Sequence, residues 1–494
     1  MCYNQERFSL TKQITKLLEN IDFKLFGVLP DRIESIKNNS RDVRQGDLFF
    51  AIHGIQADGH DYIHQAVTNK AIAIVAEKYT ENLSVPQIIV ENSRAVLSTV
   101  AANYYDHPSK HLKIIGVTGT NGKTTTVYLL NQIFKSANKS RGTIGTLGYS
   151  INDQFYALNL TTPDSIQIQE ILANMVADGI ELVAMEVSAH ALSLNRVDDI
   201  EFYVGIFTNI SQDHLDFYSD IENYMAAKKR LFEIIKPDGY RLSNLDDRYA
   251  PAFNTTGHST LYTYGLNQKA DFNWNNDAEY QTGISGKILF SGDQIPIETK
   301  LSGRFNLSNI LAATGGAICS GITANHITDA LRKIQYIPGR LQEISRPGFP
   351  RVFVDYAHTP DAIVNVLTAL RDIVPVDGKL ITVFGCGGNR DKTKRPQMAK
   401  ASASLSDIVI VTTDNPRHEE PETIINDVIA GFESNQTYKK IVDRKQAIEF
   451  AVENAGLNDI VAILGKGHED YQEIKGIKYP FSDVMIVNKL LGNK

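Results

Sequence analysis

The sequence has little of several features that mark specialised classes of protein. Its 494 residues include three cysteines, Cys2, Cys319 and Cys386, which are far apart and form no CxxC pair. Neither a disulfide framework nor a zinc site is therefore expected. No run of about 18 apolar residues occurs, and the polar N-terminus lacks the apolar core of a signal peptide. We therefore expect a cytoplasmic protein with no membrane insertion.

The sequence also has no excess of positive charge. With 50 basic and 57 acidic residues its formal net charge is −7, so no overall basic field exists to bind nucleic acid or an anionic membrane. The composition, 43% hydrophobic and 22% charged, is that of an ordinary globular protein. At roughly 100 to 200 residues per domain, the length predicts about three domains and excludes a single small binding module.

The sequence pattern divides the chain into three parts, 1–108, 109–340 and 341–494. The first mixes short apolar runs with helical stretches and ends in the polar segment YYDHPSKHLK. The second has apolar runs typical of a parallel α/β sheet, and a stretch near 240–300 that we expect to form appended hairpins. The third alternates four apolar strands, such as KLITVFG and DIVAILG, with helix-length segments. The predicted fold is α/β with three domains, the last of them Rossmann-like.

The most specific motif is TGTNGKT at 118–124, between an apolar strand and an amphipathic helix. Such a turn aims backbone N–H groups at phosphate oxygens, Lys123 neutralises their charge, and Thr124 can bind Mg²⁺. The first position of the usual GxxxxGK[ST] pattern holds Val117 instead of glycine. The flanking strand and helix favour a P-loop over a chance GKT tripeptide. The predicted ATP-phosphate site is Gly119, Thr120, Asn121, Gly122, Lys123, Thr124 and Thr125.

Two side chains suited to binding metal follow later strands of the middle part. Glu186 ends the apolar run VAMEV, and His214 follows FYVGIFTN beside Asp213. Both should lie at the carboxyl edge of the sheet near the P-loop, where they could bind Mg²⁺; the alternative for His214 is a surface loop. Lys228 lies in the helical segment YMAAKKRLF, whose spacing favours a solvated lysine. The chemical alternative is a lysine carbamylated by CO₂ that bridges two metals, and the residues alone leave both open.

Charged residues follow three strands of the C-terminal part. Arg390 comes after KLITVFG, the tetrapeptide Asp414, Asn415, Pro416 and Arg417 after DIVIVTT, and Gly465 and Glu469 after DIVAILG. Loops at the carboxyl ends of parallel strands form a binding crevice, and arginine binds carboxylates bidentately. Glu469 adds a carboxylate for an ammonium group. Surface ion pairs are the alternative for each arginine, but one amino-acid ligand would satisfy the whole set.

At this point several motifs in order resemble the Mur ligases, the ATP-dependent amide-forming enzymes of peptidoglycan synthesis. They are TGTNGKT, MEVSAHAL, TNISQDHLDFY, GRFNLSNILAA, PGRLQ and VDYAHTPDA. The resemblance implies three domains that bind in turn a UDP-sugar, ATP and an amino acid, with Mg²⁺ as the metal. DNPR and GKGHEDYQ are similar to the members that add meso-diaminopimelate to UDP-N-acetylmuramoyl-L-alanyl-D-glutamate, through an acyl phosphate.

The resemblance also implies roles for single residues. It implies catalytic roles for Lys123, Glu186, His214 and Lys228, with Thr124, Glu186, His214 and carbamylated Lys228 as the metal ligands. It places at the ATP, in addition to the P-loop, Asn309, Arg340, Asp355 and His358. It places at the UDP-muramoyl dipeptide Asn38, Ser40, Ile55, Gln56, Ala57, Thr161, Thr162, Ser188, Leu194 and Arg196. Leu160 and Leu194 depart from relatives that carry Asn and Gln there. The diaminopimelate site is implied at Arg390, Asp414, Asn415, Pro416, Arg417, Gly465 and Glu469.

Three other functions stay as alternatives. The first is a Mur ligase that adds L-lysine, which would not need Arg417 of DNPR. The second is a folylpolyglutamate synthetase, which would need neither HGIQADGH nor DNPR. The third is a P-loop switch of the GTPase kind, but the sequence has no NKxD tetrapeptide to specify guanine. We expect a monomer that acts on small-molecule substrates.

Overall fold

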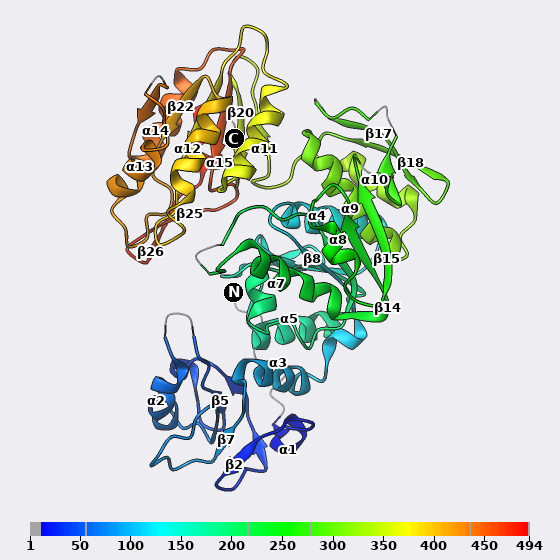
Figure 1. Cartoon of the computed structure of the whole chain (residues 1–494), viewed down its shortest axis with the longest axis vertical. Helices are drawn as coiled ribbons and strands as arrows, with labels where there is room; N and C mark the ends of the chain where they lie inside the picture. Colours follow the sequence, from blue (N-terminus) through cyan, green and yellow to red (C-terminus); the bar gives the residue numbers. More distant parts are fainter. Residues whose placement is uncertain are drawn as a thin grey trace.

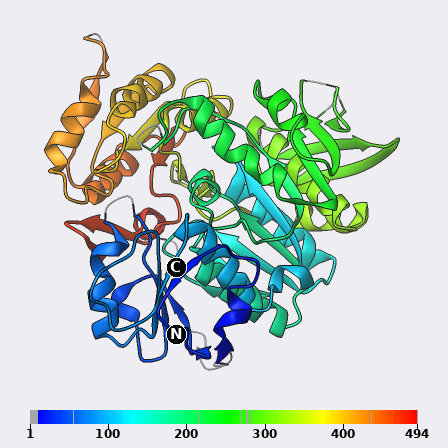
Figure 2. The same ribbon diagram turned by 60° about the horizontal axis from the view of Figure 1, so that its bottom comes forward.

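The computed structural model describes residues 11–54, 57–214, 217–267, 269–275, 278–281, 283–434 and 436–492. Figure 1 shows three α/β domains along the long axis, and Figure 2 shows the first (blue) and the last (orange) on the same side of the central one. The predicted three-domain α/β fold is confirmed, while the exact boundaries at 108 and 340 stay predictions. None of the described helices is long and apolar enough to cross a membrane.

The N-terminal domain contains a five-stranded sheet of order β2-β7-β6-β5-β4. The strands β4 to β7 are parallel, and β2 lies antiparallel at the edge. The elements are β1 (Lys12–Gln13), α1 (Ile14–Leu17), β2 (Lys24–Phe26), β3 (Arg32–Ile33), β4 (Ile36–Lys37), β5 (Leu48–Phe50), α2 (Ile63–Thr68), β6 (Ala73–Ala76), β7 (Gln87–Ile89) and α3 (Ser93–Tyr104). The side chain of Asn92 caps α3, and Thr99 on that helix donates to Asp199 of the central domain at 3.2 Å.

The central domain is built on an 11-stranded sheet of order β11-β10-β9-β12-β8-β13-β14-β15-β16-β17-β18. Its strands are β8 (Lys113–Thr118), β9 (Arg141–Gly145), β10 (Gly148–Ile151), β11 (Gln154–Tyr156), β12 (Leu182–Glu186), β13 (Phe202–Phe207), β14 (Ile235–Asn244), β15 (Thr260–Gly265), β16 (Phe272–Trp274), β17 (Ile284–Phe290) and β18 (Asp293–Thr299). Its helices are α4 (Lys123–Ser136), α5 (Ser165–Ala177), α6 (Ala189–Ser193), α7 (Ile221–Glu233), α8 (Ala250–Asn254), α9 (Arg304–Cys319) and α10 (Ala324–Lys333).

The middle strand β8 shows why this sheet is buried on both faces. Ile115 and Val117 point into one hydrophobic core, and Ile114 points into the core on the other face. Because successive side chains of a strand alternate in direction, the run KIIGVT supplies both cores at once. Gly116 has no room for a side chain, since a Cβ there would lie 2.8 Å from the Phe202 ring. The packing therefore fixes the strand whose end begins the P-loop.

The prediction of appended hairpins near 240–300 is only partly right. The strands β14, β15 and β16 continue the main sheet in parallel, whereas β16, β17 and β18 pair antiparallel in sequence order as the prediction requires. The helix α8 connects β14 to β15, which makes the parallel arrangement possible because parallel neighbours need a crossover connection. Alternation of apolar and polar residues marks a strand, but it does not specify the direction of its neighbour.

The C-terminal domain has a six-stranded sheet of order β19-β20-β24-β21-β22-β23. The strands β20 to β24 are parallel and β19 is antiparallel at the edge, as a doubly wound fold requires. The strands are β19 (Gln342–Ile344), β20 (Arg351–Asp355), β21 (Leu380–Phe384), β22 (Ile408–Val411), β23 (Tyr438–Lys440) and β24 (Ile460–Leu464), with a separate hairpin of β25 (Tyr471–Ile474) and β26 (Ile477–Pro480). The helices are α11 (Pro360–Arg371), α12 (Lys394–Leu405), α13 (Pro421–Ile429), α14 (Arg444–Glu453) and α15 (Asp483–Leu490).

Candidate active site

The P-loop connects the end of β8 to the start of α4, and its two glycines are required by the space around them. Gly119 and Gly122 have φ values of 148° and 87°. A Cβ on Gly119 would lie 1.8 Å from the Thr208 hydroxyl, and one on Gly122 would lie 2.4 Å from Asn309 Oδ1. Asn209 accepts from the amides of Thr120 and Asn121. The amides left for phosphate are therefore those in the first turn of α4, which have no intrahelical partner.

Lys123 is the first residue of α4, and its side chain reaches back across the P-loop. Its Nζ donates to the carbonyl oxygens of Gly119 at 2.8 Å and Thr120 at 2.9 Å. Burial lowers the pKa of Lys123, while Glu186 and Asp213 act in the opposite direction. A phosphate group at the loop would find this ammonium already held beside it.

Glu186 stands at the end of β12 with 1% of its surface exposed. Its Oε2 accepts from the hydroxyls of Thr124 at 3.0 Å and Thr146 at 3.1 Å, and its Oε1 accepts from the Thr146 amide at 2.8 Å. A Cβ on Gly145 would lie 2.4 Å from Glu186 Oε1, so this carboxylate leaves no space for a side chain there. Thr146 was not predicted from the sequence, since it follows β9 in a segment with no recognised motif.

Lys228 is not a solvated helix lysine. It lies on α7 with 1% of its surface exposed, and its Nζ donates to the Gly119 carbonyl at 2.8 Å. Burial lowers its pKa well below the ordinary value, and the neighbouring charge of Lys123 lowers it further. Spacing alone favours a solvated lysine, and this interpretation is wrong, because α7 packs so that Lys228 contacts the P-loop.

His214 and Asp213 lie beside this lysine, at the end of the described segment that follows β13. The ring Nε2 of His214 is 3.4 Å from Asp213 Oδ2. Burial lowers the pKa of His214 to about 3, so its imidazole is neutral at pH 7 and able to bind a metal. Burial would raise the pKa of Asp213, but His214, His358 and Lys394 outweigh it and lower that pKa to about 2.

The donors present fit Mg²⁺ bound together with phosphates. Among the described residues no group of three or more His, Cys, Asp and Glu side chains forms a closed metal site. Mg²⁺ is usually held by one or two carboxylates together with substrate phosphates and water, which an open pair such as Thr124 and Glu186 suits.

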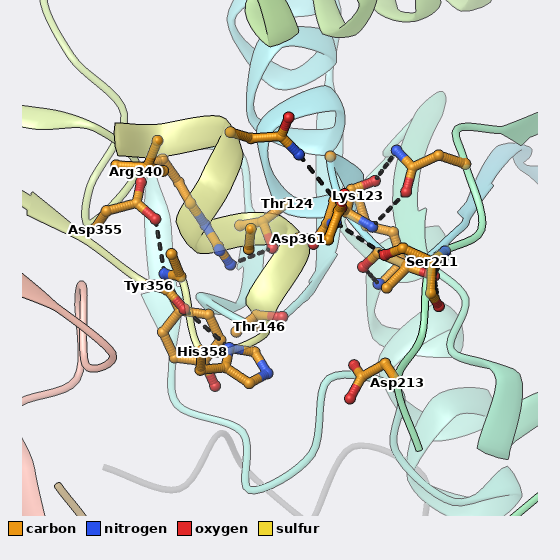
Figure 3. Close-up of a pocket in the computed structure, with 18 of the residues that line it drawn as sticks. Lys123, Thr124, Thr146, Ser211, Asp213, Arg340, Asp355, Tyr356, His358 and Asp361 are labelled. Carbon is orange, nitrogen blue, oxygen red and sulfur yellow. Dashed lines mark hydrogen bonds between the residues drawn. The ribbon is translucent and has the colours of Figure 1, made fainter. Parts of the chain in front are cut away.

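Arg340 and residues of the C-terminal domain contact the P-loop and the loop after β13, and Figure 3 shows Arg340 and Asp361 beside Thr124 and Lys123. Arg340 Nη2 donates to the Thr124 hydroxyl at 2.9 Å, and Asn121 Nδ2 donates to Asp361 Oδ2 at 2.8 Å. Lys394 Nζ lies 4.0 Å from Asp213 Oδ1. Asp361 was missed from the sequence, because a contact across 240 positions has no local signal.

The predicted residues Asp355 and His358 lie on the same wall of the site as Arg340. Asp355 accepts from the amides of Leu341 at 2.6 Å and Ala357 at 2.7 Å, which fixes the turn after β20. His358 Nδ1 is 2.9 Å from the Tyr356 carbonyl, and the Arg340 guanidinium lies 4.6 Å from the Tyr356 ring centroid. Arg340 therefore contacts both the P-loop residue Thr124 and the turn after β20.

The predicted amino-acid site forms the far wall. Arg417 has a backbone φ of 51°, and its Nη1 donates to the Gly388 carbonyl at 2.8 Å. Its Nε is 3.2 Å from Glu473 Oε2. Arg390 is exposed, and among the described residues it has no ion-pair partner. Gly465 must be glycine, since a Cβ there would lie 2.6 Å from Asp414 Oδ2.

A single cavity of about 570 Å³ brings most of these groups together. Its walls include residues predicted for ATP and metal, for the muramoyl dipeptide and for diaminopimelate. They are Thr120, Asn121, Gly122, Lys123, Thr124, Thr125, Thr161, Glu186, Ser188, His214, Asn309, Arg340, Asp355, His358, Arg390, Asp414, Asn415, Arg417, Gly465 and Glu469. Gly119, Lys228 and Pro416 lie behind its surface. The cavity thus connects a phosphate-binding loop to paired arginines and carboxylates.

The residues predicted for the muramoyl dipeptide divide between two places. Next to the cavity, Thr162 donates from its hydroxyl to the Glu186 carbonyl at 2.9 Å, and Arg196 donates to the Thr162 carbonyl at 3.0 Å. Leu160 is 49% exposed and Leu194 follows α6, and as leucines neither has a polar side-chain atom to offer a ligand. On the N-terminal domain, buried Ser40 donates to Gln65 at 2.7 Å, and Asn38 and Ala57 do not line the cavity. Ile55 and Gln56 lie outside the described residues.

Two partly buried, neutral histidines, His358 and His468, predict how stability depends on pH. Burial lowers the pKa values of His358 and His468 to about 4. An unfolded histidine takes up a proton below about pH 6.5, whereas these do so only near pH 4. The unfolded state therefore binds more protons in this window, and stability falls as pH falls.

Lowering the pH from 7.5 to 5.5 should reduce the melting temperature of His358→Gln less than that of the parent protein. The two reductions should differ by about 2 °C, which corresponds to about 1 kcal/mol in the free energy of unfolding. Differential scanning calorimetry at the two pH values measures it. An equal loss in both proteins would contradict the buried neutral state of His358.

Comparison with known proteins gives a consistent family match. Residues 117–317 match the family model described as Mur ligase middle domain, 339–467 match Mur ligase, glutamate ligase domain, and 32–105 match Mur ligase family, catalytic domain. A relative from Aquifex aeolicus is 42% identical over 461 residues, 93% of this chain and 94% of its own. One from Clostridium acetobutylicum is 39% identical over 487 residues, 97% of this chain and 100% of its own. Both are named as UDP-N-acetylmuramoyl-L-alanyl-D-glutamate–2,6-diaminopimelate ligases.

Comparison with solved structures supports the same family match. A structure titled as the same ligase is 31% identical, covers 98% of this chain and 99% of its own, and superposes with a TM-score of 0.68. The folylpolyglutamate synthase of Mycobacterium tuberculosis, complexed with ADP and AMPPCP, is 16% identical with a TM-score of 0.65 and covers 81% of this chain and 96% of its own. At that identity the second likeness concerns the fold alone.

Proposed function

Because the chain belongs to the Mur ligase family, we infer that it is an ATP-dependent ligase that joins meso-2,6-diaminopimelate to the D-glutamyl γ-carboxylate of UDP-N-acetylmuramoyl-L-alanyl-D-glutamate. The observation that supports this most is the single cavity between the P-loop and the charged loops of the C-terminal sheet. A nucleotide and an amino acid can meet there. Residues 32–105, which match a Mur ligase domain, have no purpose in a folylpolyglutamate synthetase.

The reaction needs ATP because a carboxylate is a poor electrophile. A γ-carboxylate oxygen attacks the γ-phosphorus of ATP, the bond to ADP breaks, and an acyl phosphate forms. The amine of diaminopimelate then attacks the acyl carbon, loses a proton, and expels phosphate to leave an amide. Lys123 stabilises the charge on the transferred phosphoryl group, and the Arg340 and Asn121 contacts hold the domain closed so that water is excluded.

Thr124, Glu186, His214 and Lys228 would hold magnesium in this site. Bound Mg²⁺ would neutralise phosphate charge. For its part, Lys228 has a feature that carbamylation needs, since burial favours the uncharged form of its amine, and that form attacks CO₂ with loss of a proton. The carbamate would add an anionic ligand close to His214.

Replacing Lys228 by methionine is expected to reduce ligase activity at least about 100-fold, because the anionic ligand is lost. Wild-type protein kept free of CO₂ should lose activity and regain it with bicarbonate, whereas the variant should not respond. The neighbouring, less buried Lys229→Met is the matched control and should retain activity within about 2-fold of wild type. Full activity of Lys228→Met, with no bicarbonate effect on the wild type, would contradict the proposal.

The function itself is tested by phosphate release from ATP with all three substrates present. We expect release with meso-diaminopimelate at a rate at least about 100-fold above that with L-lysine, because lysine lacks the distal carboxylate that Arg417 would bind. Equal rates would favour the lysine-adding alternative. No release with either amine would reject the ligase. A cytoplasmic location, where ATP is supplied, is part of the same proposal, and fractionation of cells would test it.

A further inference from the structure

A lysine that the cavity does not expose lies at the centre of the proposed amino-acid site. Lys466 has 0% of its surface exposed. Its Nζ donates to Asn415 Oδ1 at 3.0 Å and to Glu469 Oε2 at 2.9 Å, and it lies 3.7 Å from Asp414 Oδ1. All three partners line the cavity, whereas Lys466 lies behind them. Its contacts are therefore to the residues that would bind the ligand.

These contacts restrict Glu469 to one orientation. Glu469 Oε2 accepts from both Lys466 and Asn415 Nδ2, each at 2.9 Å. Among the residues that the structure describes, none donates to Oε1. Since a carboxylate has two oxygens with about four acceptor positions, the protein uses one oxygen as an anchor and leaves the other for an ammonium group.

Asn415 connects this anchor to the arginine. Its Oδ1 accepts from Lys466 and also from the amide of Glu473, at 2.9 Å. The Glu473 carboxylate is 3.2 Å from Arg417 Nε, and the backbone carbonyl of Glu473 accepts from the Arg417 amide at 3.0 Å. A continuous set of hydrogen bonds thus runs from Glu469 through Lys466, Asn415 and Glu473 to Arg417.

We propose that Lys466 is a positioning residue. Acting through Asn415 and Glu473, it fixes the spacing between Glu469, which binds the ammonium group, and Arg417, which binds the carboxylate. This spacing sets the stereochemical preference at the distal centre of the amino acid. The proposal rests on the proposed function. Two stereoisomers of diaminopimelate differ at that centre only in which direction the ammonium group points. A fixed pair of opposite charges can distinguish them, whereas flexible groups would follow either isomer.

The test compares meso- and LL-diaminopimelate with wild type and Lys466→Met. We expect the ratio of kcat/KM values, meso over LL, to fall at least about 10-fold. The KM for meso-diaminopimelate should rise at least about 20-fold, while the KM for ATP stays within about 2-fold. Lys445→Met, at a lysine of α14 whose side chain is 56% exposed, is the matched control and should leave all these values unchanged.

Every outcome of this comparison either supports or overturns the role proposed for Lys466. An unchanged stereoisomer ratio in a folded Lys466→Met would overturn the proposal, even if all rates fell together. If that variant does not fold, Glu473→Gln serves instead, because it removes the charge beside Arg417 but keeps the backbone amide that donates to Asn415. It should lower the ratio at least about 5-fold, and an unchanged ratio would again overturn the proposal. Wild-type protein that uses neither isomer would reject the proposed function itself.

Discussion

Lys123→Met is expected to lower kcat/KM by about 10³-fold or more, an effect of about 4 kcal/mol on the transition state. The ammonium group of Lys123 is held at the P-loop by the carbonyl oxygens of Gly119 and Thr120, so it is in place before ATP arrives. Methionine keeps the length and the apolar stem but removes the charge. Because the phosphoryl group gains its stabilisation mainly in the transition state, kcat should fall more than the KM for ATP rises.

The matched control for Lys123→Met is Lys135→Met, on the same helix α4. The Lys135 side chain is 54% exposed and forms a surface ion pair with Asp153 at 2.8 Å. Such pairs contribute little, so activity should stay within about 2-fold of wild type. Steady-state kinetics of both variants, with melting temperatures to show that they are folded, measure the effect. A folded Lys123→Met that retains more than a tenth of wild-type kcat/KM would contradict the role of this lysine.

Arg417→Gly is expected to reduce kcat/KM for meso-diaminopimelate about 100-fold while leaving the slow reaction with L-lysine within about 3-fold. The guanidinium would bind the distal carboxylate, which lysine lacks. Glycine is chosen because Arg417 has φ of 51°, a left-handed conformation that costs a residue with a Cβ about 1 kcal/mol but costs glycine nothing. The melting temperature should therefore not fall, which separates lost recognition from lost folding.

Arg351→Ala is the control for Arg417, because Arg351 lies in the same domain and its side chain is 38% exposed beside Glu343. It should leave both kcat/KM values unchanged. The measurement is the ratio of the two kcat/KM values for each protein. If Arg417→Gly keeps the full preference for diaminopimelate, another group must bind the distal carboxylate, and Arg390 becomes the next candidate.

Local patterns predicted the parts of the site that depend on strand ends. The P-loop is a strand, a turn and a helix adjacent in sequence, so its geometry follows from its residues alone. Glu186 is the last residue of a buried strand and His214 lies in the segment after another, and parallel strands bring such positions to one edge of a sheet. The same rule placed Arg390, Arg417 and Glu469 together, and the structure brings them to one cavity.

Other parts could not be predicted, because their cause lies far away in the sequence. Helical spacing alone predicts that Lys228 is solvated. Its amine is buried because α7 packs against the P-loop, and the local sequence does not show that packing. Asp361 meets Asn121 only when two domains close. Lys466 is inside the motif GKGHED, but nothing local shows that its side chain is buried behind Asn415 and Glu469 and bonds to both. Strand direction near 240–300 depends on the α8 crossover, which alternation does not reveal.

The central claim is that ATP activates the D-glutamyl γ-carboxylate as an acyl phosphate before the amine attacks. It is tested most directly by labelling both γ-carboxylate oxygens of the UDP-muramoyl dipeptide with ¹⁸O and analysing the phosphate by mass spectrometry. The carboxylate oxygen that attacks phosphorus leaves with it when the amide forms. We therefore predict one ¹⁸O atom in each phosphate released during amide formation. Unlabelled phosphate, or ¹⁸O found in AMP, would contradict the claim.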